Sequence, residues 1–183
     1  MHDKNARTWT DPDDGVIYDL SHMESFITDF EVKLSKSSPV VKTPVKIVFS
    51  NHCFSRKKTD EDNESQVITV ETKRDGTTEY RVFCPTRWEF SKRLPEILSD
   101  LSYRSCLEGG SREIVYRQED RSAVGQHDGW YICMRLNHKK KADIQFEIWV
   151  RSAHWRNNRP ADIRNHGGKR FCMLLSSYIA SKK

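Results

Sequence analysis

Apolar and polar residues alternate along the first half of the chain in a way that predicts β-strands after a polar beginning. Residues 1–16 are acidic, rich in turn formers and poor in apolar side chains, so we expect a flexible acidic arm there. The segments DFEVKLS and VKIVFS both alternate, which is typical of half-buried strands. Farther along, Asp75-Gly76 lies between two β-rich segments and predicts a hairpin, because Asp-Gly readily adopts the positive φ angles of a tight turn.

A helical pattern follows the hairpin over residues 86–101. Large apolar side chains recur there at helical spacing, namely Leu94, Ile97, Leu98 and Leu101. Pro95 lies inside the pattern and cannot donate an intrahelical hydrogen bond. The helix therefore either kinks at Pro95 or begins there, with the proline in its first turn.

Four strand-like segments come after the helix: REIVYRQ, GWYICMRLN, IQFEIWVRSAHW and KRFCMLLSSYIA. In the third, alternation gives one face Phe146, Ile148 and Val150, and the other face Glu147, Trp149 and Arg151. We therefore predict an α+β fold in which N-terminal strands and a hairpin precede one main helix and a four-strand antiparallel sheet. Residues 17–183 would form this single domain, with the helix packed on the apolar face of the sheet.

Charge is distributed unevenly along the chain. Residues 1–40 hold 4 Lys or Arg against 8 Asp or Glu, whereas residues 121–183 hold 13 against 4, and the whole chain has a net charge of +5. The C-terminal third is therefore strongly basic, whereas the rest of the chain carries a mixture of both charges. A basic face can follow the phosphates of a nucleic acid, although the same composition also suits an ordinary solvated surface.

The spacing of the cysteines and the absence of several known motifs exclude some classes of protein and of site. Five scattered cysteines without CxxC spacing do not form a disulfide framework, which favours a reducing, cytoplasmic location. We find no apolar segment long enough for a membrane span, no secretory signal, and no Walker, GxGxxG, HExxH or GxSxG motif. Adjacent His52 and Cys53 have poor geometry for one zinc ion, so we expect no metal and no cofactor. A nucleophilic pair of Cys53 with a histidine stays open.

Arginine and aromatic residues on the polar face of the predicted sheet point to RNA. Cations bind phosphates, and aromatic rings stack on unpaired bases. The candidate RNA-binding residues are Arg87, Arg93, Arg117, Arg135, Trp149, Trp155, Arg156, Lys169 and Arg170. The alternative is that Trp149 packs under the helix or a loop while the arginines only solvate the edges of the sheet.

RNA cleavage by attack of the 2′-hydroxyl needs a general base, a general acid and cations near phosphorus, but no metal. Histidine serves as base or acid near neutral pH, and arginine stabilises the charged phosphate. We predict catalytic roles for His52, Arg56, Arg151 and His154, with His52 and Arg151 lining one shallow basic cleft. His166, beside Arg164, Lys169 and Arg170, is a further candidate.

Several quoted segments resemble known proteins. VKIVFSNHCFSR, YRVFCPTRWEFSKRLPEIL and EIWVRSAHWR resemble a group of uncharacterised proteins carried on bacterial chromosomes, phages and plasmids. More distantly, an N-terminal His…Arg element, a Leu-Pro helix and four antiparallel strands are similar to the Barnase–EndoU–colicin–RelE superfamily of small ribonucleases. This resemblance implies metal-independent RNA cleavage, with its basic and histidine positions at His52, Arg56, Arg87 and Arg93, and its cleft lined by Arg151, Ser152 and His154. The chain departs from that pattern in having His154 where tyrosine is expected.

Two functions of different classes follow from these observations. The first is a metal-independent endoribonuclease of the toxin or effector type, acting on RNA in the cytoplasm and paired with an antitoxin. The second is a non-catalytic accessory protein of a phage or plasmid, which binds nucleic acid or a host protein. Both use the basic face, neither involves a membrane, and they differ in whether the histidines do chemistry.

Overall fold

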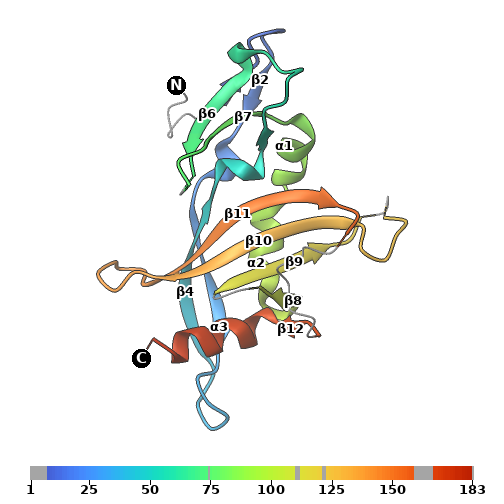
Figure 1. Ribbon diagram of the computed structural model, residues 1–183. Helices are drawn as coiled ribbons and strands as arrows, with labels where there is room; N and C mark the ends of the chain where they lie inside the picture. Colours follow the sequence, from blue (N-terminus) through green and yellow to red (C-terminus); the bar gives the residue numbers. More distant parts are fainter. Residues whose placement is uncertain (1–7, 74, 110–111, 121–122, 159–166, 183) are drawn as a thin grey trace.

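Figure 1 shows the computed structural model of the chain, which describes residues 8–73, 75–109, 112–120, 123–158 and 167–182. Within these ranges seven strands form one mixed sheet: β3 (Phe26–Val32), β4 (Val41–Phe49), β8 (Ser105–Glu108), β9 (Glu113–Gln118), β10 (Gly129–His138), β11 (Phe146–Arg156) and β12 (Lys169–Arg170). Their order across the sheet is β12-β8-β9-β10-β11-β4-β3. A small sheet in the order β5-β7-β6 is formed by β5 (Ser55–Lys57), β6 (Val67–Thr72) and β7 (Thr78–Phe83).

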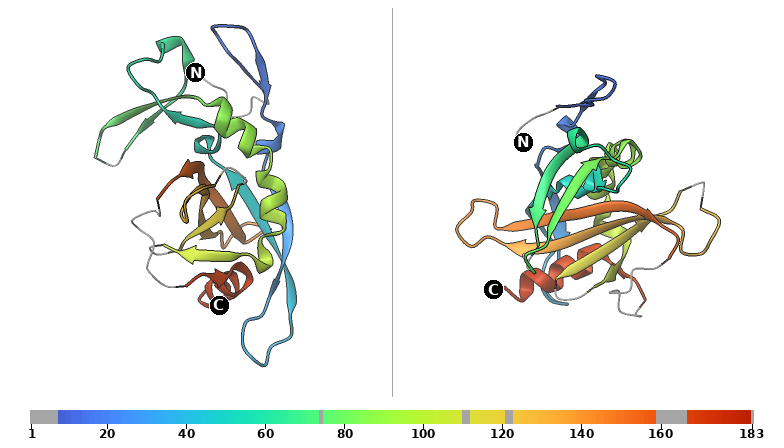
Figure 2. Two further views of the ribbon diagram at one scale, coloured as in Figure 1. Left: turned by 90° about the vertical axis from the view of Figure 1, so that its right-hand side faces the viewer. Right: turned by 45° about the horizontal axis from the view of Figure 1, so that its top comes forward.

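The α-helices pack on one side of the large sheet and are α1 (Pro85–Ser91), α2 (Leu94–Ser99) and α3 (Phe171–Ala180). Short 3-10 turns connect other elements: η1 (Ser21–Met23), η2 (Asn51–Cys53), η3 (Glu64–Gln66) and η4 (Leu101–Tyr103). Figure 2 shows the sheet curling, with α2 and α3 on its inner side. We call this helix-covered side of β9, β10 and β11 the inner face, and the opposite side the outer face.

The prediction of one main helix followed by a four-strand antiparallel sheet is wrong. The N-terminal strands join the large sheet, because β4 pairs in parallel with β11 while β3 pairs antiparallel with β4. The segment KRFCMLLSSYIA, predicted as a strand, is mostly α3. Its buried residues Phe171, Leu174, Leu175 and Ile179 have the spacing of a helix, which the run of β-prone residues obscured. The short strand β8 was missed altogether.

The helix predicted over residues 86–101 is broken into two. α1 ends at Ser91, and α2 begins at Leu94 with Pro95 in its first turn. The second of the two alternatives for Pro95 is therefore confirmed, because a proline in the first turn removes no intrahelical hydrogen bond. The Asp75-Gly76 hairpin is also confirmed: β6 and β7 pair up to Thr72 and Thr78, and Gly76 has a φ of 81°.

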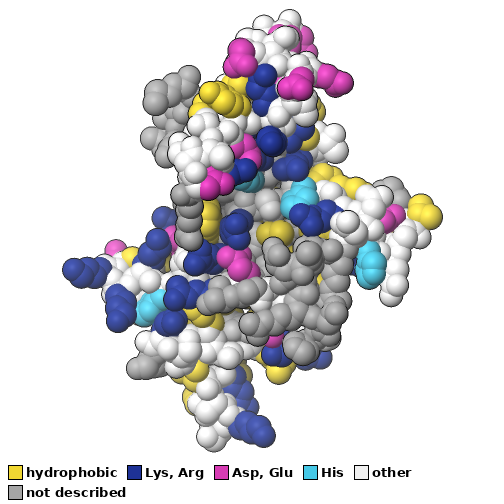
Figure 3. Space-filling view, viewed as in Figure 1, with side chains coloured by type: hydrophobic (Ala, Val, Ile, Leu, Met, Phe, Trp, Pro, Cys, Tyr) yellow, Lys and Arg dark blue, Asp and Glu magenta, His cyan; other side chains and the backbone are white. Residues whose placement is uncertain are grey.

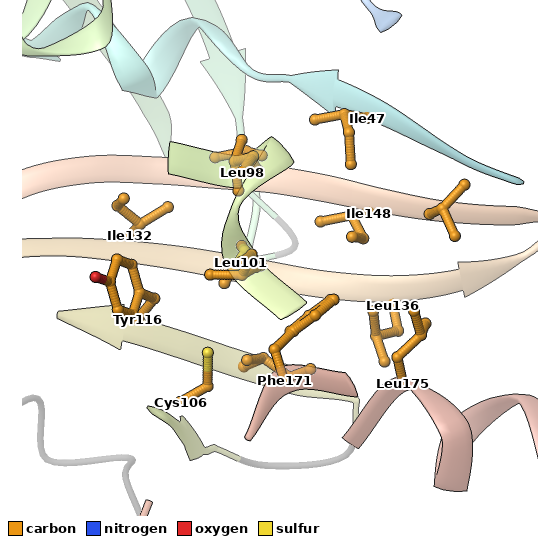
Figure 4. Packing of buried hydrophobic residues seen from close by; sticks show 14 of the residues in the cluster. Ile47, Leu98, Leu101, Cys106, Tyr116, Ile132, Leu136, Ile148, Phe171 and Leu175 are labelled. Atoms are coloured by element: carbon orange, nitrogen blue, oxygen red, sulfur yellow. The ribbon is translucent and has the colours of Figure 1, made fainter. Parts of the chain in front are cut away.

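The apolar face predicted for β11 forms the centre of the core. Ile148 and Val150 are fully buried, and Phe146 packs at the margin of the same cluster. Figure 4 shows the leucines of α2 and η4 packed over this side of the strands, with Phe171 and Leu175 of α3 beside them. Burying each such side chain contributes about 1.5–3 kcal/mol, which is why the strand turns this face inward.

A β-bulge interrupts the alternation of β11. Cys133 pairs with Ser152 and Met134 with Val150, so Arg151 has no partner residue on β10. An extra residue shifts the alternation by one position. Beyond the bulge Ala153 is fully buried on the inner face, and His154 therefore turns to the outer face, opposite Tyr131.

The N-terminal segment docks on the small sheet. Residues 8–16, which we expected in a flexible arm, belong to a hairpin of β1 (Thr8–Thr10) and β2 (Ile17–Asp19). Trp9 stacks on Phe83 with ring centroids 4.4 Å apart, and Tyr18 packs against the same ring. These aromatic contacts tie the hairpin to β7. Across the described ranges, no helix is long and apolar enough to cross a membrane.

Candidate functional site

The segment FSNHCF turns the chain from β4 into the small sheet, and β11 holds that turn in place. The Ser50 backbone N–H donates to the carbonyl of Val150 (3.0 Å), and the Ser50 hydroxyl donates to the carbonyl of Arg151 (2.6 Å). The same hydroxyl oxygen accepts from the backbone N–H of His52 (3.1 Å), which caps the short turn η2. The bulge of β11 therefore positions the backbone of His52.

The His52 ring is oriented by a carboxylate on the small sheet. Its Nε2 donates to Glu71, 2.8 Å from Oε2 and 3.0 Å from Oε1, and Asn51 Nδ2 donates to the same carboxylate at 3.1 Å. Burial lowers the pKa of His52, and the hydrogen bond to Glu71 offsets part of this effect. Burial alone would raise the pKa of Glu71, but the hydrogen bonds from His52 and Asn51 hold it below its usual value. With Nε2 bound to Glu71, Nδ1 is the nitrogen left for chemistry.

Glu71 was not among the residues predicted from the sequence, although the pattern of the hairpin contained a signal for it. Pairing of β6 with β7 places Glu71 directly opposite Glu79. Two carboxylates facing each other across a ladder are unfavourable unless cations lie between them. Glu79 accepts from Arg81 (2.6 Å) and pairs with Lys73 (2.8 Å), which leaves Glu71 to bind His52.

Arg87 of α1 reaches the same turn from the other side. Its Nη1 donates to the carbonyls of Ser55 (2.7 Å) and His52 (3.3 Å). Burial lowers the pKa of this guanidinium, but an arginine stays protonated throughout the physiological range. No carboxylate of the described residues pairs with Arg87, so none of them neutralises its charge.

His154 lies among these cations. Its Nε2 accepts a hydrogen bond from Arg156 Nε at 2.6 Å. Burial, followed by the positive charges of Arg87, Arg156 and His52, lowers the pKa of His154 to about 4. His154 is therefore neutral at pH 7, and the lone pair of its Nε2 accepts from Arg156 while the charge of Arg87 also acts on the ring. Arg156, like Arg87, has no carboxylate partner in the part of the chain that the structure describes.

We call His52, Arg87, His154 and Arg156 the histidine–arginine cluster. It lies where the small sheet meets β11, and Figure 3, which looks onto the outer face, shows histidine and basic side chains gathered at this junction. Cations that converge without neutralising carboxylates favour an anion such as a phosphate group. The arrangement can bind a phosphate and present two imidazoles to it.

The other two predicted catalytic residues are neutralised by carboxylates. Arg56 binds Asp62 through both Nη atoms, at 2.6 and 2.5 Å, and this pairing holds the pKa of Asp62 well below its usual range. Arg151 lies 3.0 Å from Glu113. Ser50 links the backbones of His52 and Arg151, but the guanidinium of Arg151 pairs with Glu113 and is not part of the cluster. That His52 and Arg151 line one cleft stays a prediction.

The predicted RNA-binding residues divide into several groups. Arg135, Trp149 and Arg151 lie together on the outer face, with Arg135 3.8 Å from Glu113 and the Arg151 guanidinium 5.9 Å from the Trp149 ring centroid. Trp155 instead turns to the inner face and packs edge-on against Trp130.

The remaining basic candidates are spread around the molecule. Arg117 pairs with Glu119, Arg93 lies 3.8 Å from Asp120, and Lys169 lies 2.8 Å from Glu108. Lys169 and Arg170 form β12 at the far edge of the sheet from β11, so they do not join the cluster. Arg164 and His166 lie outside the described residues.

The chemistry expected of the cysteines and of a metal can also be compared with the structure. Cys53 is fully buried in the core, and burial raises the pKa of its thiol to about 12, which excludes it as a nucleophile near neutral pH. Among the residues that the structure describes, no three His, Cys, Asp or Glu side chains are grouped so as to hold a metal ion.

Comparisons with known proteins gave one result. Searches of curated proteins and of solved structures found no match to this chain. The family model described as the YjaZ family matches residues 8–179, nearly the whole chain. The chain therefore belongs to the YjaZ family.

Proposed function

We propose that this protein is a metal-independent endoribonuclease whose active site is the histidine–arginine cluster. One observation carries the proposal: two histidines from distant segments meet two arginines that have no carboxylate partner in the described residues. This is the set of groups that cleavage by the 2′-hydroxyl requires, namely a base, an acid and cations for the charge on phosphorus.

In the proposed reaction Arg87 and Arg156 bind the non-bridging oxygens of the scissile phosphate. Their fork of N–H donors stabilises the additional negative charge as the 2′-oxygen bonds to phosphorus. Phosphate binding also changes His154, because a nearby anion offsets the cations that lower its pKa. His154 becomes a stronger base once the substrate is present.

The two imidazoles then have separate roles. When Arg156 turns its N–H donors to the phosphate, its hydrogen bond to His154 Nε2 is released and the lone pair of that nitrogen becomes free. His154 then takes the proton from the 2′-hydroxyl at Nε2, and the 2′-oxygen displaces the 5′-oxygen of the next nucleotide. His52, protonated and held by Glu71 at Nε2, donates its Nδ1 proton to that departing oxygen. The products are a 2′,3′-cyclic phosphate and a free 5′-hydroxyl, so no water, metal or oxidant is consumed in this step.

The first experiment is RNA cleavage in the presence of EDTA. The wild-type protein should cleave total RNA, and H52A, H154A and R87Q should each lose at least about 100-fold in rate, the usual contribution of an acid–base group. H127A is the matched control, since His127 is exposed in the loop before β10. Cleavage that survives in H52A and H154A would exclude the cluster as the active site.

A substrate with a sulfur leaving group separates the two roles. A 5′-phosphorothiolate needs little protonation as it departs, so it should restore cleavage by H52A but not by H154A. Rescue of H154A alone would reverse the assignment of acid and base. RNA binding that falls steeply with salt, without any product, would instead favour the non-catalytic binding protein.

A further inference from the structure

The tip of the β10–β11 hairpin carries basic side chains that the proposed active site does not use. The two strands pair out to His138 and Phe146, and the turn beyond is closed by the Lys139 N–H donating to the Gln145 carbonyl at 2.7 Å. Three consecutive lysines, Lys139 to Lys141, are exposed on this turn. The hairpin therefore projects a cluster of positive charge beyond the body of the sheet, as Figure 3 shows on its left side.

Two of these lysines have no acidic partner. Lys139 lies 3.7 Å from Glu147, whereas Lys140 and Lys141 form no ion pair within the described ranges. Asp143 is the acidic side chain of the same turn and is exposed. Because no carboxylate in the described part of the chain pairs with Lys140 or Lys141, their charges are available to a ligand.

Further cations connect the tip to the histidine–arginine cluster along the outer face. Arg135 and Arg151 share the single carboxylate of Glu113, at 3.8 and 3.0 Å, which leaves one net positive charge. The half-buried ring of Trp149 lies between the tip and the cluster, beneath the guanidinium of Arg151. A strip of cations with an aromatic ring in it is the composition that binds single-stranded nucleic acid.

We propose that the outer face of β10 and β11 binds a single strand of RNA from the histidine–arginine cluster to the hairpin tip, where Lys140 and Lys141 contact its phosphates. The identity of the strand as RNA rests on the proposed function, whereas the binding path does not. Trp149 would stack on a base part-way along this path, and Arg135 and Arg151 would follow the backbone.

The length of the path predicts the length of RNA that it prefers. From His154 back to Phe146 the chain of β11 advances eight residues, or about 26 Å at the rise of a β-strand. A strand with the stacked rise of about 3.4 Å per nucleotide needs about eight nucleotides to cover this distance, and an extended strand needs fewer. Affinity should therefore rise between about four and eight nucleotides and then level off.

Fluorescence anisotropy with labelled 2′-O-methyl oligonucleotides tests this path, because these oligonucleotides cannot be cleaved by 2′-hydroxyl attack. The K140Q/K141Q variant should bind a 12-mer about tenfold more weakly than the wild type, and a 4-mer equally well. Its salt dependence, the slope of log K against log salt, should fall by about 1.4, since two phosphate contacts are lost. K33Q/K36Q, which removes two exposed lysines near the end of the β3–β4 hairpin, is the matched control and should change neither value.

The outcomes separate this proposal from the ribonuclease. If K140Q/K141Q weakens the 12-mer while the wild type cleaves no RNA, the path is supported and the active site is refuted. If K140Q/K141Q binds the 12-mer like the wild type, or weakens the 4-mer equally, the path is overturned, whether or not RNA is cleaved. A 12-base-pair duplex that binds as tightly as the single strand would also overturn it, as would an acidic protein binding the tip when no oligonucleotide does.

Discussion

The low pKa of His154 predicts how the stability of this protein depends on pH. The folded protein binds the His154 proton with a pKa of about 4, whereas an unfolded chain binds it near 6.5. As the pH falls below about 6.5, the unfolded state therefore takes up this proton first, and the free energy of unfolding decreases. The loss should continue until the pH approaches 4, where folded His154 is also protonated.

The size of this loss of stability follows from the pKa values of His154 in the folded and unfolded states. At pH 5 the folded state loses about 2 kcal/mol relative to pH 7, because each pH unit between 6.5 and 5 corresponds to about 1.4 kcal/mol. This is an upper value, since the half-buried ring keeps some contact with solvent. The H154Q variant cannot take up the proton, so its stability should fall less between pH 7 and pH 5, by up to about 2 kcal/mol.

Urea unfolding of both proteins at the two pH values measures this difference. His22 and His52 also have a lowered pKa, but they are present in both proteins and cancel in the comparison. H127Q, which changes an exposed histidine, should behave like the wild type. An H154Q protein that loses as much stability as the wild type would refute the reasoning, because His154 would then not be held neutral by Arg87, Arg156 and burial.

Three further predictions concern the site and the core. Because burial lowers the pKa of both His52 and His154, kcat/KM should follow a bell-shaped curve with its maximum below pH 6.5, and a maximum above pH 7 would contradict the assigned roles. E71Q should lower the pKa of His52 further, as followed by NMR titration of its ring protons, since the carboxylate favours the protonated ring; an unchanged pKa would mean that the hydrogen bond does not act in solution. Leu98 is fully buried, so L98A should reduce the free energy of unfolding in urea by about 2–5 kcal/mol, whereas V70A at an exposed position should change it by less than about 0.5 kcal/mol; equal effects would disprove the placement of α2 over the core.

Sequence reasoning failed wherever a local pattern was compatible with two structures. The segment of α3 is rich in residues that favour strands, and its helical spacing became decisive once Phe171 and Leu175 packed on the sheet. The parallel pairing of β4 with β11 joins residues about a hundred positions apart, and neither strand marks its partner in its own sequence. Side-chain patterns report which face of an element is buried, and they do not report which element covers it.

The sequence by itself determined the features that depend on neighbouring residues: the Asp75-Gly76 turn, an irregularity of the helical segment at Pro95, and the inward face of Ile148 and Val150. Backbone preferences and the two-residue period of a strand act over a few positions, so they can be read directly from the chain.

The tertiary structure alone decided which charged groups remain available for chemistry. Arg56 forms an ion pair with Asp62, and Arg151 forms one with Glu113. Arg87, in contrast, donates only to backbone carbonyls among the described residues. The bulge that turns His154 toward Arg87 is likewise set by pairing with β10. Ion pairs and strand register join residues that are distant in the chain, and their outcome depends on how every element packs.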